Sequence, residues 1–254
     1  MDSYLYALIS TYVPEHFEIL TDLAGGLLIK EIKDGKSYGN GVLHSFNDEP
    51  AKILKDGTQI WYWYGEIHRN NDLPAVVHPN GTVMWFQNGK KHRDNDLPAI
   101  IQADGSREWY RNGILHCENG PALVWPNGTR YSYQNGQIHS YNDLPAIVWS
   151  KGDQEWYQNG KRHRNNDLPA IITVQGDQYW YQNGLLHRDN DLPASVSSNG
   201  SKDWYRKGVR HRDNDLPATI FSHGPREWWR DGIIYHSSYI FNDTNPFKTW
   251  SGGN

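Results

Sequence analysis

Histidine and aspartate recur together along the chain, four residues apart. The pairs are His68/Asp72, His92/Asp96, His139/Asp143, His163/Asp167, His187/Asp191 and His211/Asp215. A carboxylate at this distance could orient an imidazole for general-base catalysis. An active site is normally a single place in a protein, whereas this pair is repeated. We therefore interpret these residues as structural residues of a repeated loop and expect no catalytic residue among them.

The same histidines raise the question of a metal site. If each repeat contributes two β-strands at about 4.8 Å each, equivalent histidines lie roughly 9 to 10 Å apart. Zinc requires its ligands within about 2.1 Å of one ion. The spacing argues against a shared metal ion, so we expect neither a metal nor a cofactor.

Three acidic loops, residues 94–96, 189–191 and 213–215, each read Asp-Asn-Asp and offer oxygen atoms that could hold calcium. The alternative is an Asx turn, in which the side chain accepts a hydrogen bond from its own backbone. We favour the turn because Arg93, Arg188 and Arg212 stand beside these carboxylates and can neutralise them. Motifs of phosphate binding, nucleophilic catalysis and zinc proteolysis are missing from the sequence, and we expect a protein that is not an enzyme.

The period behind these motifs is 24 residues. Prolines stand at positions 50, 74, 98, 121, 145, 169, 193 and 217, so successive prolines are 24 residues apart except for one gap of 23. Each unit also carries a glycine at a turn and a second glycine eight residues later. We expect a tandem array over residues 35–236, an N-terminal cap at 1–34 and a degenerate C-terminal cap at 237–254.

Each unit is expected to form one β-hairpin. Residues 97–101 are apolar and β-branched, Asp104-Gly105 is a turn dipeptide, and residues 108–110 form the returning strand. If Asn80 and Gly81 form a two-residue turn, Ala75 pairs with Phe86 and Val76 with Trp85. The second glycine and the His-Arg-Asp-Asn-Asp stretch then connect one hairpin to the next. The predicted fold is all-β: an elongated, solenoid-like array of about eight to nine antiparallel hairpins with a short capping helix at residues 3–12.

The hairpin pattern predicts two faces. We expect a stacked core from the leucine before each proline, the alanine after it, the invariant Ile/Val position and the second aromatic residue of each pair. The opposite face carries tryptophan beside a column that varies from Lys52 to Ile100 to Thr219, which indicates shallower burial. On this face we expect a partly exposed partner-binding surface formed by Trp61, Trp85, Trp109, Trp156, Trp180, Trp204 and Trp228.

Composition excludes several classes of protein. The 254 residues include 24 Gly and 13 Pro, which rules out a helical bundle, and 12 Trp and 16 Tyr, which argue against disorder. A formal charge of −4 argues against nucleic acid and makes membrane association a weaker expectation. We expect a cytoplasmic or otherwise intracellular location, because the start has no signal-peptide pattern and Cys117 is the single cysteine.

The string Asp104-Gly105-Ser106-Arg107, followed by aromatic residues, Asn112-Gly113 and His116, resembles the membrane occupation and recognition nexus (MORN) repeat. The chain is similar to a variant form, with adjacent Trp-Tyr residues and an Arg-Asp-Asn-Asp-Leu-Pro-Ala stretch after the histidine. Similar variant arrays occur in large DNA viruses of protists and in some bacteria. The resemblance implies a twisted antiparallel sheet that scaffolds other proteins or lies at membranes.

These observations favour a non-enzymatic module that binds or scaffolds a protein partner and has the capacity to self-associate. One alternative is a carbohydrate-binding module, because aromatic ladders with Asn and Gly also resemble cell-wall-binding repeats. A second alternative is attachment to a membrane surface. The partner's identity stays open at this point.

Overall fold

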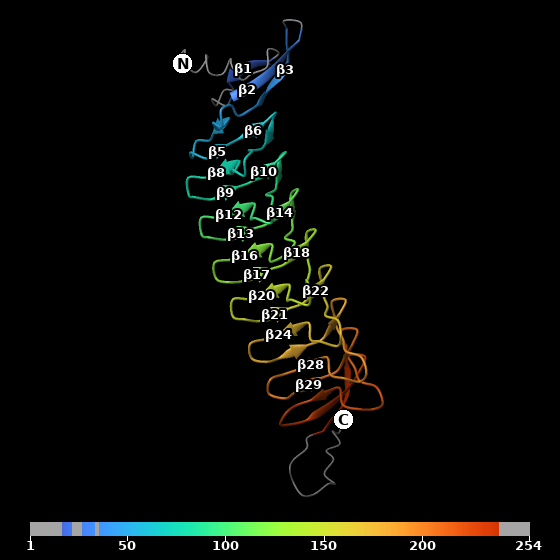
Figure 1. The fold of residues 1–254 in the computed structure, drawn as a ribbon. Coiled ribbons are helices and arrows are strands. Elements are labelled where there is room, and N and C mark those ends of the chain that lie inside the picture. The colour runs from blue at the N-terminus through green and yellow to red at the C-terminus, as the bar shows by residue number, and fades with distance from the viewer. Residues whose placement is uncertain (1–16, 22–26, 34–35, 239–254) are drawn as a thin grey trace. The chain divides into compact units, whose positions relative to one another are not determined.

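The computed structural model describes residues 17–21, 27–33 and 36–238, with side chains from residue 41 onward. Every helix or strand assigned in these residues is a β-strand, and antiparallel hairpins follow one another along the chain (Figure 1). This confirms the predicted all-β array of hairpins. Two units, Met1–Pro126 and Asn127–Asn254, are built from the same repeat. The helix expected at 3–12 and residues 239–254 of the expected C-terminal cap lie outside the described residues.

The first unit begins with three antiparallel strands and continues into a sheet whose strands pair in chain order. The opening strands are β1 (Phe17–Thr21), β2 (Leu27–Lys33) and β3 (Lys36–Leu43). The sheet contains β4 (Lys52–Ile53), β5 (Gln59–Ile60), β8 (Val76–Val77), β9 (Val83–Met84), β12 (Ile100–Ile101), β13 (Arg107–Glu108) and β16 (Leu123–Val124).

The second unit repeats this arrangement. Its sheet contains β17 (Arg130–Tyr131), β20 (Ile147–Val148), β21 (Gln154–Glu155), β24 (Ile171–Ile172), β25 (Gln178–Tyr179), β28 (Ser195–Val196), β29 (Lys202–Asp203), β32 (Thr219–Ile220), β33 (Arg226–Arg230) and β34 (Ile233–Ser238). Within each unit the wide turns lie along one side and small hairpins along the other (Figure 1).

The register of the main hairpins differs by one residue from the sequence prediction. Val76 pairs with Met84 and Val77 with Val83, so the predicted pairs Ala75/Phe86 and Val76/Trp85 are wrong. The Gly81 amide donates to the His78 carbonyl at 3.0 Å, and the His78 amide donates to Thr82 at 2.9 Å. Gly81 has a φ of 91°, as in a three-residue loop that ends in a left-handed glycine. With this longer loop, the tryptophan that follows the second strand is not paired with a residue of the first strand of its own hairpin.

A second, smaller hairpin follows in each full repeat, where the sequence prediction placed only a connection. In one example Phe86 pairs with Lys91, and Asn88 and Gly89 between them both have positive φ, 48° and 71°. Two such residues form the type I′ turn that closes two-residue hairpins. The Gly89 amide donates to the Ile67 carbonyl of the preceding small hairpin at 3.0 Å, so these hairpins also stack.

The small hairpins occur in both units. In the first unit they are β6/β7 (Tyr62–Trp63, Glu66–Ile67), β10/β11 (Phe86–Gln87, Lys90–Lys91) and β14/β15 (Tyr110–Arg111, Ile114–Leu115). In the second they are β18/β19 (Tyr133–Gln134, Gln137–Ile138), β22/β23 (Tyr157–Gln158, Lys161–Arg162), β26/β27 (Tyr181–Gln182, Leu185–Leu186) and β30/β31 (Tyr205–Arg206, Val209–Arg210).

The core lies along the alanine that follows each proline. These alanines, from Ala51 to Ala218, are at most 1% exposed. The Ile/Val column expected to be buried is mostly half-buried, and Ile53 is exposed, whereas the varied column beside it buries Val76, Ile100, Ile147, Ser195 and Thr219. The predicted order of burial for these two columns is therefore wrong: in most repeats the residue directly after the buried alanine is more deeply buried than the Ile/Val residue that follows it.

Candidate functional site

The repeated tryptophan lies inside the repeat. Trp61, Trp85, Trp156, Trp180 and Trp204 are buried, and Trp109 and Trp228 are half-buried. The expectation of a partly exposed tryptophan surface is wrong for the five buried rings. Their backbone amides donate to the alanine carbonyl of the next repeat at 2.8 Å. Each tryptophan therefore lies at the junction between one repeat and the next.

Each of these tryptophans is held by an aspartate that precedes it by thirteen residues. The indole Nε1 donates to the aspartate's backbone carbonyl at 2.8 to 2.9 Å. In five of the described repeats, an arginine eight residues after the tryptophan lies over the ring, with Cζ 3.8 to 3.9 Å from the ring centroid. The Nε and Nη2 atoms of that arginine donate to both carboxylate oxygens of the aspartate at 2.7 to 2.8 Å.

We call this arrangement the arginine clamp. It occurs as Asp48/Trp61/Arg69, Asp72/Trp85/Arg93, Asp143/Trp156/Arg164, Asp167/Trp180/Arg188 and Asp191/Trp204/Arg212. It combines a cation–π contact with a bidentate, charge-assisted hydrogen bond. Because the aspartate and arginine are 21 residues apart, each clamp ties one repeat to the next.

The clamp arginines favour the negatively charged form of the aspartates that they bind. Hydrogen bonds from the paired arginine lower the pKa of Asp48, Asp72, Asp143, Asp167 and Asp191 from its ordinary value. The carboxylates remain about half exposed, so solvent screens each pair and its individual contribution to stability is small. The larger contribution comes from burial of the indole ring beneath the guanidinium.

The histidines of the predicted pairs link successive small hairpins. The Nδ1 atoms of His68, His92 and His163 accept the backbone amide of the small-hairpin turn in the next repeat at 3.1 to 3.2 Å. Their Nε2 atoms face the Asn or Asp two residues later at 2.9 to 3.0 Å. An Nδ1 that accepts an amide N–H leaves Nε2 as the donor to this side-chain oxygen. The Nδ1 atoms of His139, His187 and His211 accept the equivalent amides at 3.1 to 3.4 Å.

Each histidine and the aspartate four residues later have different partners in the described repeats. His211 Nε2 faces Asp213 at 2.8 Å, and the Asp215 carboxylate accepts a hydrogen bond from Arg230 Nη2 at 2.8 Å instead. The reason is that the chain turns sharply between the two residues, because Asn214 and Asp215 both have left-handed φ values, 60° and 51°. The other five aspartates also have different partners: Asp72, Asp143, Asp167 and Asp191 bind the clamp arginines, and Asp96 contacts Cys117.

His44 makes the same link to a small hairpin but is buried, and burial changes its pKa. His44 is 6% exposed, and its Nδ1 accepts the Tyr64 amide at 3.3 Å. Burial lowers the pKa of His44 from its ordinary value because the protonated imidazole loses solvation there.

The Asp-Asn-Asp loops are tight turns whose oxygens already have partners. Asn95 and Asp96 both have left-handed φ values, 58° and 55°. The Asp94 carboxylate faces His92 Nε2 at 3.0 Å and accepts from Gln87 Nε2 at 2.9 Å. Across residues 17–21, 27–33 and 36–238, no group of three or more His, Cys, Asp or Glu side chains is arranged to hold a metal ion.

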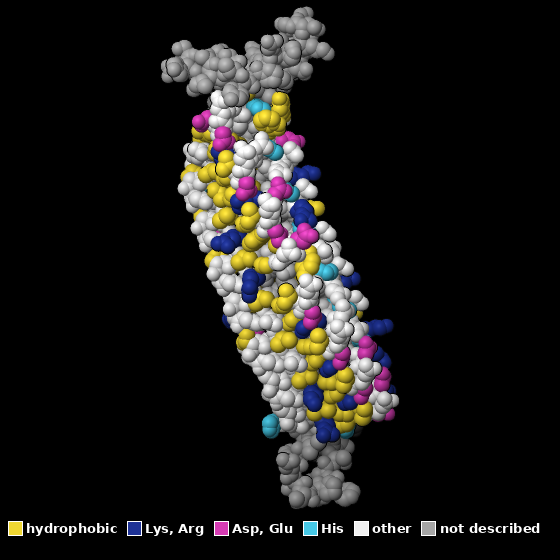
Figure 2. All heavy atoms as spheres, viewed as in Figure 1, with side chains coloured by type: hydrophobic (Ala, Val, Ile, Leu, Met, Phe, Trp, Pro, Cys, Tyr) yellow, Lys and Arg dark blue, Asp and Glu magenta, His cyan; other side chains and the backbone are white. Residues whose placement is uncertain are grey.

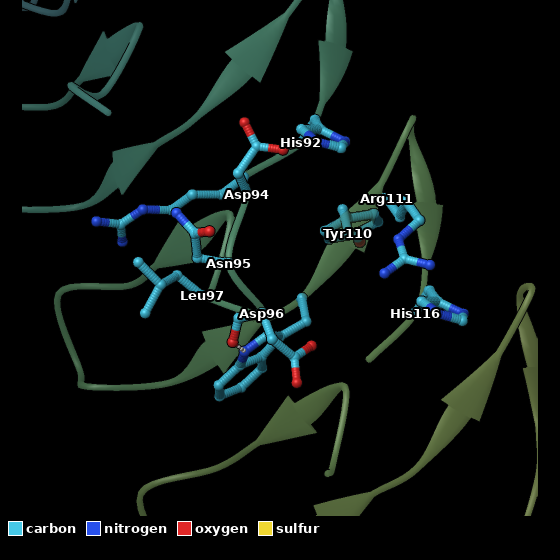
Figure 3. A pocket seen from close by; sticks show the side chains of 10 residues that line it. His92, Asp94, Asn95, Asp96, Leu97, Tyr110, Arg111 and His116 are labelled. Carbon is cyan, nitrogen blue, oxygen red and sulfur yellow. Dashed lines mark hydrogen bonds and ion pairs between the residues drawn. The ribbon is translucent and has the colours of Figure 1, made fainter. Parts of the chain in front are cut away.

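The repeat with the 23-residue proline spacing departs from the clamp. Cys117 stands where the other repeats have arginine, eight residues after Trp109. Its thiol donates to Asp96 Oδ1 at 3.2 Å, and burial, with the neighbouring carboxylate, raises the pKa of Cys117 to about 11. Asp96, Leu97, Trp109 and Arg111 help to line a cavity of about 70 Å³ (Figure 3).

The next repeat lacks all three members of the clamp, and Asn119 stands at the position of the aspartate. Ser132 replaces the tryptophan, and Ser140 replaces the arginine eight residues later. The Ser140 hydroxyl accepts the Tyr157 backbone amide at 3.0 Å. Tryptophan and arginine are therefore lost together in this repeat, and this joint loss is the signal in the sequence that the two side chains belong to one unit.

The last repeat fills the clamp position with two other residues. His236 stands eight residues after Trp228, and its ring centroid lies 4.6 Å from that of the indole. The Trp228 indole donates to the Asp215 carbonyl at 2.8 Å, as in the clamps, while Arg230 supplies the cation for the Asp215 carboxylate. The two roles of the clamp arginine are thus divided between His236 on the ring and Arg230 on the carboxylate.

The leucine before each proline is exposed, contrary to the expectation that it packs in the core. We call these residues the leucine ladder: Leu73 and Leu97 in the first unit, and Leu144, Leu168, Leu192 and Leu216 in the second, 37 to 64% exposed. Exposed carboxylates precede them in the same loops, including Asp189 and Asp213. Figure 2 shows hydrophobic side chains gathered in a band along the repeats of each unit, with charged side chains beside them.

Comparison with known proteins does not assign the chain to a family. No family model matches it, and no curated protein is significantly similar to it. In the part of the chain that the structure describes, no helix is long and apolar enough to cross a membrane. Its function must therefore be argued from the geometry of the repeats.

Proposed function

We propose that this protein is a non-enzymatic scaffolding module that binds a partner protein along its leucine ladder. The observation that carries this proposal is the recurrence of one exposed leucine in equivalent loops of consecutive repeats. Scattered single apolar residues on a surface need no explanation, whereas a regular row of them is typical of an interaction site. The repeat resemblance to MORN arrays supports the same class of function.

The ladder's spacing and charge favour an amphipathic helix as the bound segment of the partner. Consecutive repeats add two strands, so neighbouring leucines in one unit are roughly 9 to 10 Å apart. Seven residues of an α-helix span about 10.5 Å, so an apolar residue at every seventh position can follow the ladder. The exposed Asp189 beside Leu192 favours lysine or arginine along the edge of such a helix, whereas Asp213 beside Leu216 already pairs with Arg206 at 3.0 Å.

The geometry supports the two alternative functions less well. Sugar binding by stacking requires open aromatic faces, and the clamp arginines cover five of the repeated tryptophans in the described repeats. Attachment to anionic lipid favours clustered basic residues. The ladder loops carry exposed carboxylates instead.

A variant in which Leu168, Leu192 and Leu216 are replaced by Ser tests the proposal. Affinity capture with chemical cross-linking should recover a partner with the wild-type chain. We expect the variant to bind that purified partner at least tenfold more weakly, because truncated anchor residues cost about 2 kcal/mol or more each at an interface centre. Its melting temperature should change by only a few degrees.

The matched control replaces Val174 and Phe221 by Ser. Both residues, at 52% and 41%, are more exposed than the three substituted leucines, at 38%, but lie outside the ladder. This control should retain partner binding. Equal binding by the wild-type chain and the ladder variant would contradict the proposal, as would equal losses in the ladder and control variants.

A further inference from the structure

The five arginine clamps show how this chain holds a guanidinium group. In each, the planar cation lies on an indole face and donates two hydrogen bonds to one carboxylate. A third bond, from Nη1, reaches the carbonyl of the proline five residues later, for example Arg188 to Pro193 at 3.4 Å. An aspartate, a tryptophan and a backbone carbonyl therefore form a template that selects arginine, since lysine has no planar fork.

One further pair of this kind, Asp96 and Trp109, lacks its arginine. The Trp109 indole still donates to the Asp96 carbonyl at 2.9 Å, as in the clamps. Cys117 is in register with the clamp arginines, 21 residues after Asp96, but its side chain is too short to cover the ring. Accordingly, Trp109 is half-buried, whereas the five rings beneath arginines are buried. The last repeat also lacks the clamp arginine, but Arg230 takes its place on the carboxylate there.

The hydrogen bonds that Asp96 accepts within the described part of the chain come from neutral donors. They are the Cys117 thiol, the Glu118 and Asn119 amides and the Asn119 side chain, at 3.2 to 3.4 Å. These distances are longer than the 2.7 to 2.8 Å of the clamp bonds. A charged donor therefore forms a stronger bond to this carboxylate than its present partners do.

The neighbouring arginines have other partners. Arg93 belongs to the clamp of Asp72 and Trp85, and its Nη1 donates to Pro98. Arg111 pairs with Glu118 at 2.7 Å. Both arginines thus have carboxylate partners of their own, whereas the four hydrogen bonds that Asp96 accepts come from neutral donors, which an incoming arginine has to displace.

We propose that Asp96 and Trp109 form a socket for an arginine side chain of a partner protein. This inference rests on the proposed protein-binding function and specifies part of its partner. Leu97, a member of the leucine ladder, directly follows Asp96 and lines a cavity with Asp96 and Trp109 (Figure 3). An equivalent cavity is lined by Asp191 and Trp204, where the clamp arginine Arg212 is in place, so this cavity lies beside the guanidinium position. The socket is therefore continuous with the ladder, and a helix bound there would place an arginine beside its apolar residue.

The socket can be tested without knowing the partner. Blocked peptides Gly-Arg-Gly, Gly-Lys-Gly and Gly-citrulline-Gly are titrated into the full chain while the Trp109 indole N–H is followed by NMR, with Trp109→Phe to assign the signal. We expect saturable, millimolar binding of the arginine peptide. The lysine and citrulline peptides should bind at least fivefold more weakly, since one lacks the planar fork and the other the charge.

Substitutions of Cys117 and Asp96 provide a second test of the socket. Cys117→Arg should supply the guanidinium internally, remove peptide binding and raise the melting temperature. Asp96→Asn should weaken arginine-peptide binding about tenfold, whereas Cys117→Ser should retain it. Equal binding of the three peptides, or undiminished binding by both Cys117→Arg and Asp96→Asn, would overturn the socket. A partner that depends on the leucine ladder but is unaffected by these two variants would leave the scaffold function intact and remove only the socket.

Discussion

Replacing Trp180 by Ala is expected to lower the free energy of unfolding by about 3 to 5 kcal/mol. The ring is 7% exposed, donates to the Asp167 carbonyl at 2.9 Å and carries the Arg188 guanidinium 3.9 Å from its centroid. Its removal opens a cavity between two repeats and leaves the guanidinium without its aromatic surface. Urea unfolding followed by circular dichroism measures the loss.

Trp125 provides the matched control for this substitution. It is a tryptophan of the same chain that is 43% exposed, so Trp125→Ala should cost less than about 1 kcal/mol. If the two variants lose similar stability, Trp180 is not a buried clamp residue and the description of the repeat junction is wrong.

Acidification is expected to weaken the clamps in a defined pH range. Arginine lowers the pKa of the five clamp aspartates, so their stabilisation is complete above the ordinary aspartate pKa of 3.8 and disappears as the pH falls through the lowered values. Because the carboxylate of each pair is about half exposed, we expect roughly 0.5 kcal/mol per clamp after screening, a total of about 2 to 3 kcal/mol. Unfolding by urea at pH 6, 4, 3 and 2 measures this dependence.

A triple variant isolates the clamps from the other carboxylates. It combines Asp72→Asn, Asp167→Asn and Asp191→Asn, and asparagine tolerates the left-handed backbone at these positions, where φ is 53° to 54°. The variant should be less stable than the wild-type chain at pH 6 and lose less stability on acidification. An acid dependence identical to that of the wild-type chain would rule out the clamps as its source.

The repeat period and turn glycines were enough to predict the fold class, because both are local properties of the chain. The register was not predicted, since Asn80-Gly81 fits a two-residue turn as well as the observed loop through Pro79. The small hairpins were missed although dipeptides such as Asn88-Gly89 are strong hairpin signals. Their short strands have no alternating apolar pattern to distinguish them from a connection.

The clamps could not be predicted from one repeat because they join residues of two repeats. A partly exposed tryptophan face was expected because the column beside the tryptophans varies in residue type, but Arg188 reaches across from the following loop and covers Trp180. The leucine ladder was assigned to the core for a similar reason. Leu192 lies in a loop whose backbone turns at Asn190 and Asp191, so strand alternation does not determine which way its side chain faces.

The most direct test of the buried clamps and the exposed ladder is hydroxyl-radical footprinting of the free chain and of its complex with a captured partner. Tryptophan reacts with the radical when solvent reaches its ring, and leucine reacts at exposed positions. We expect slow oxidation of Trp180 and Trp204 in both states, and protection of Leu168, Leu192 and Leu216 in the complex. Rapid oxidation of the two tryptophans in the free chain, with their protection by the partner and none at the leucines, would contradict both assignments.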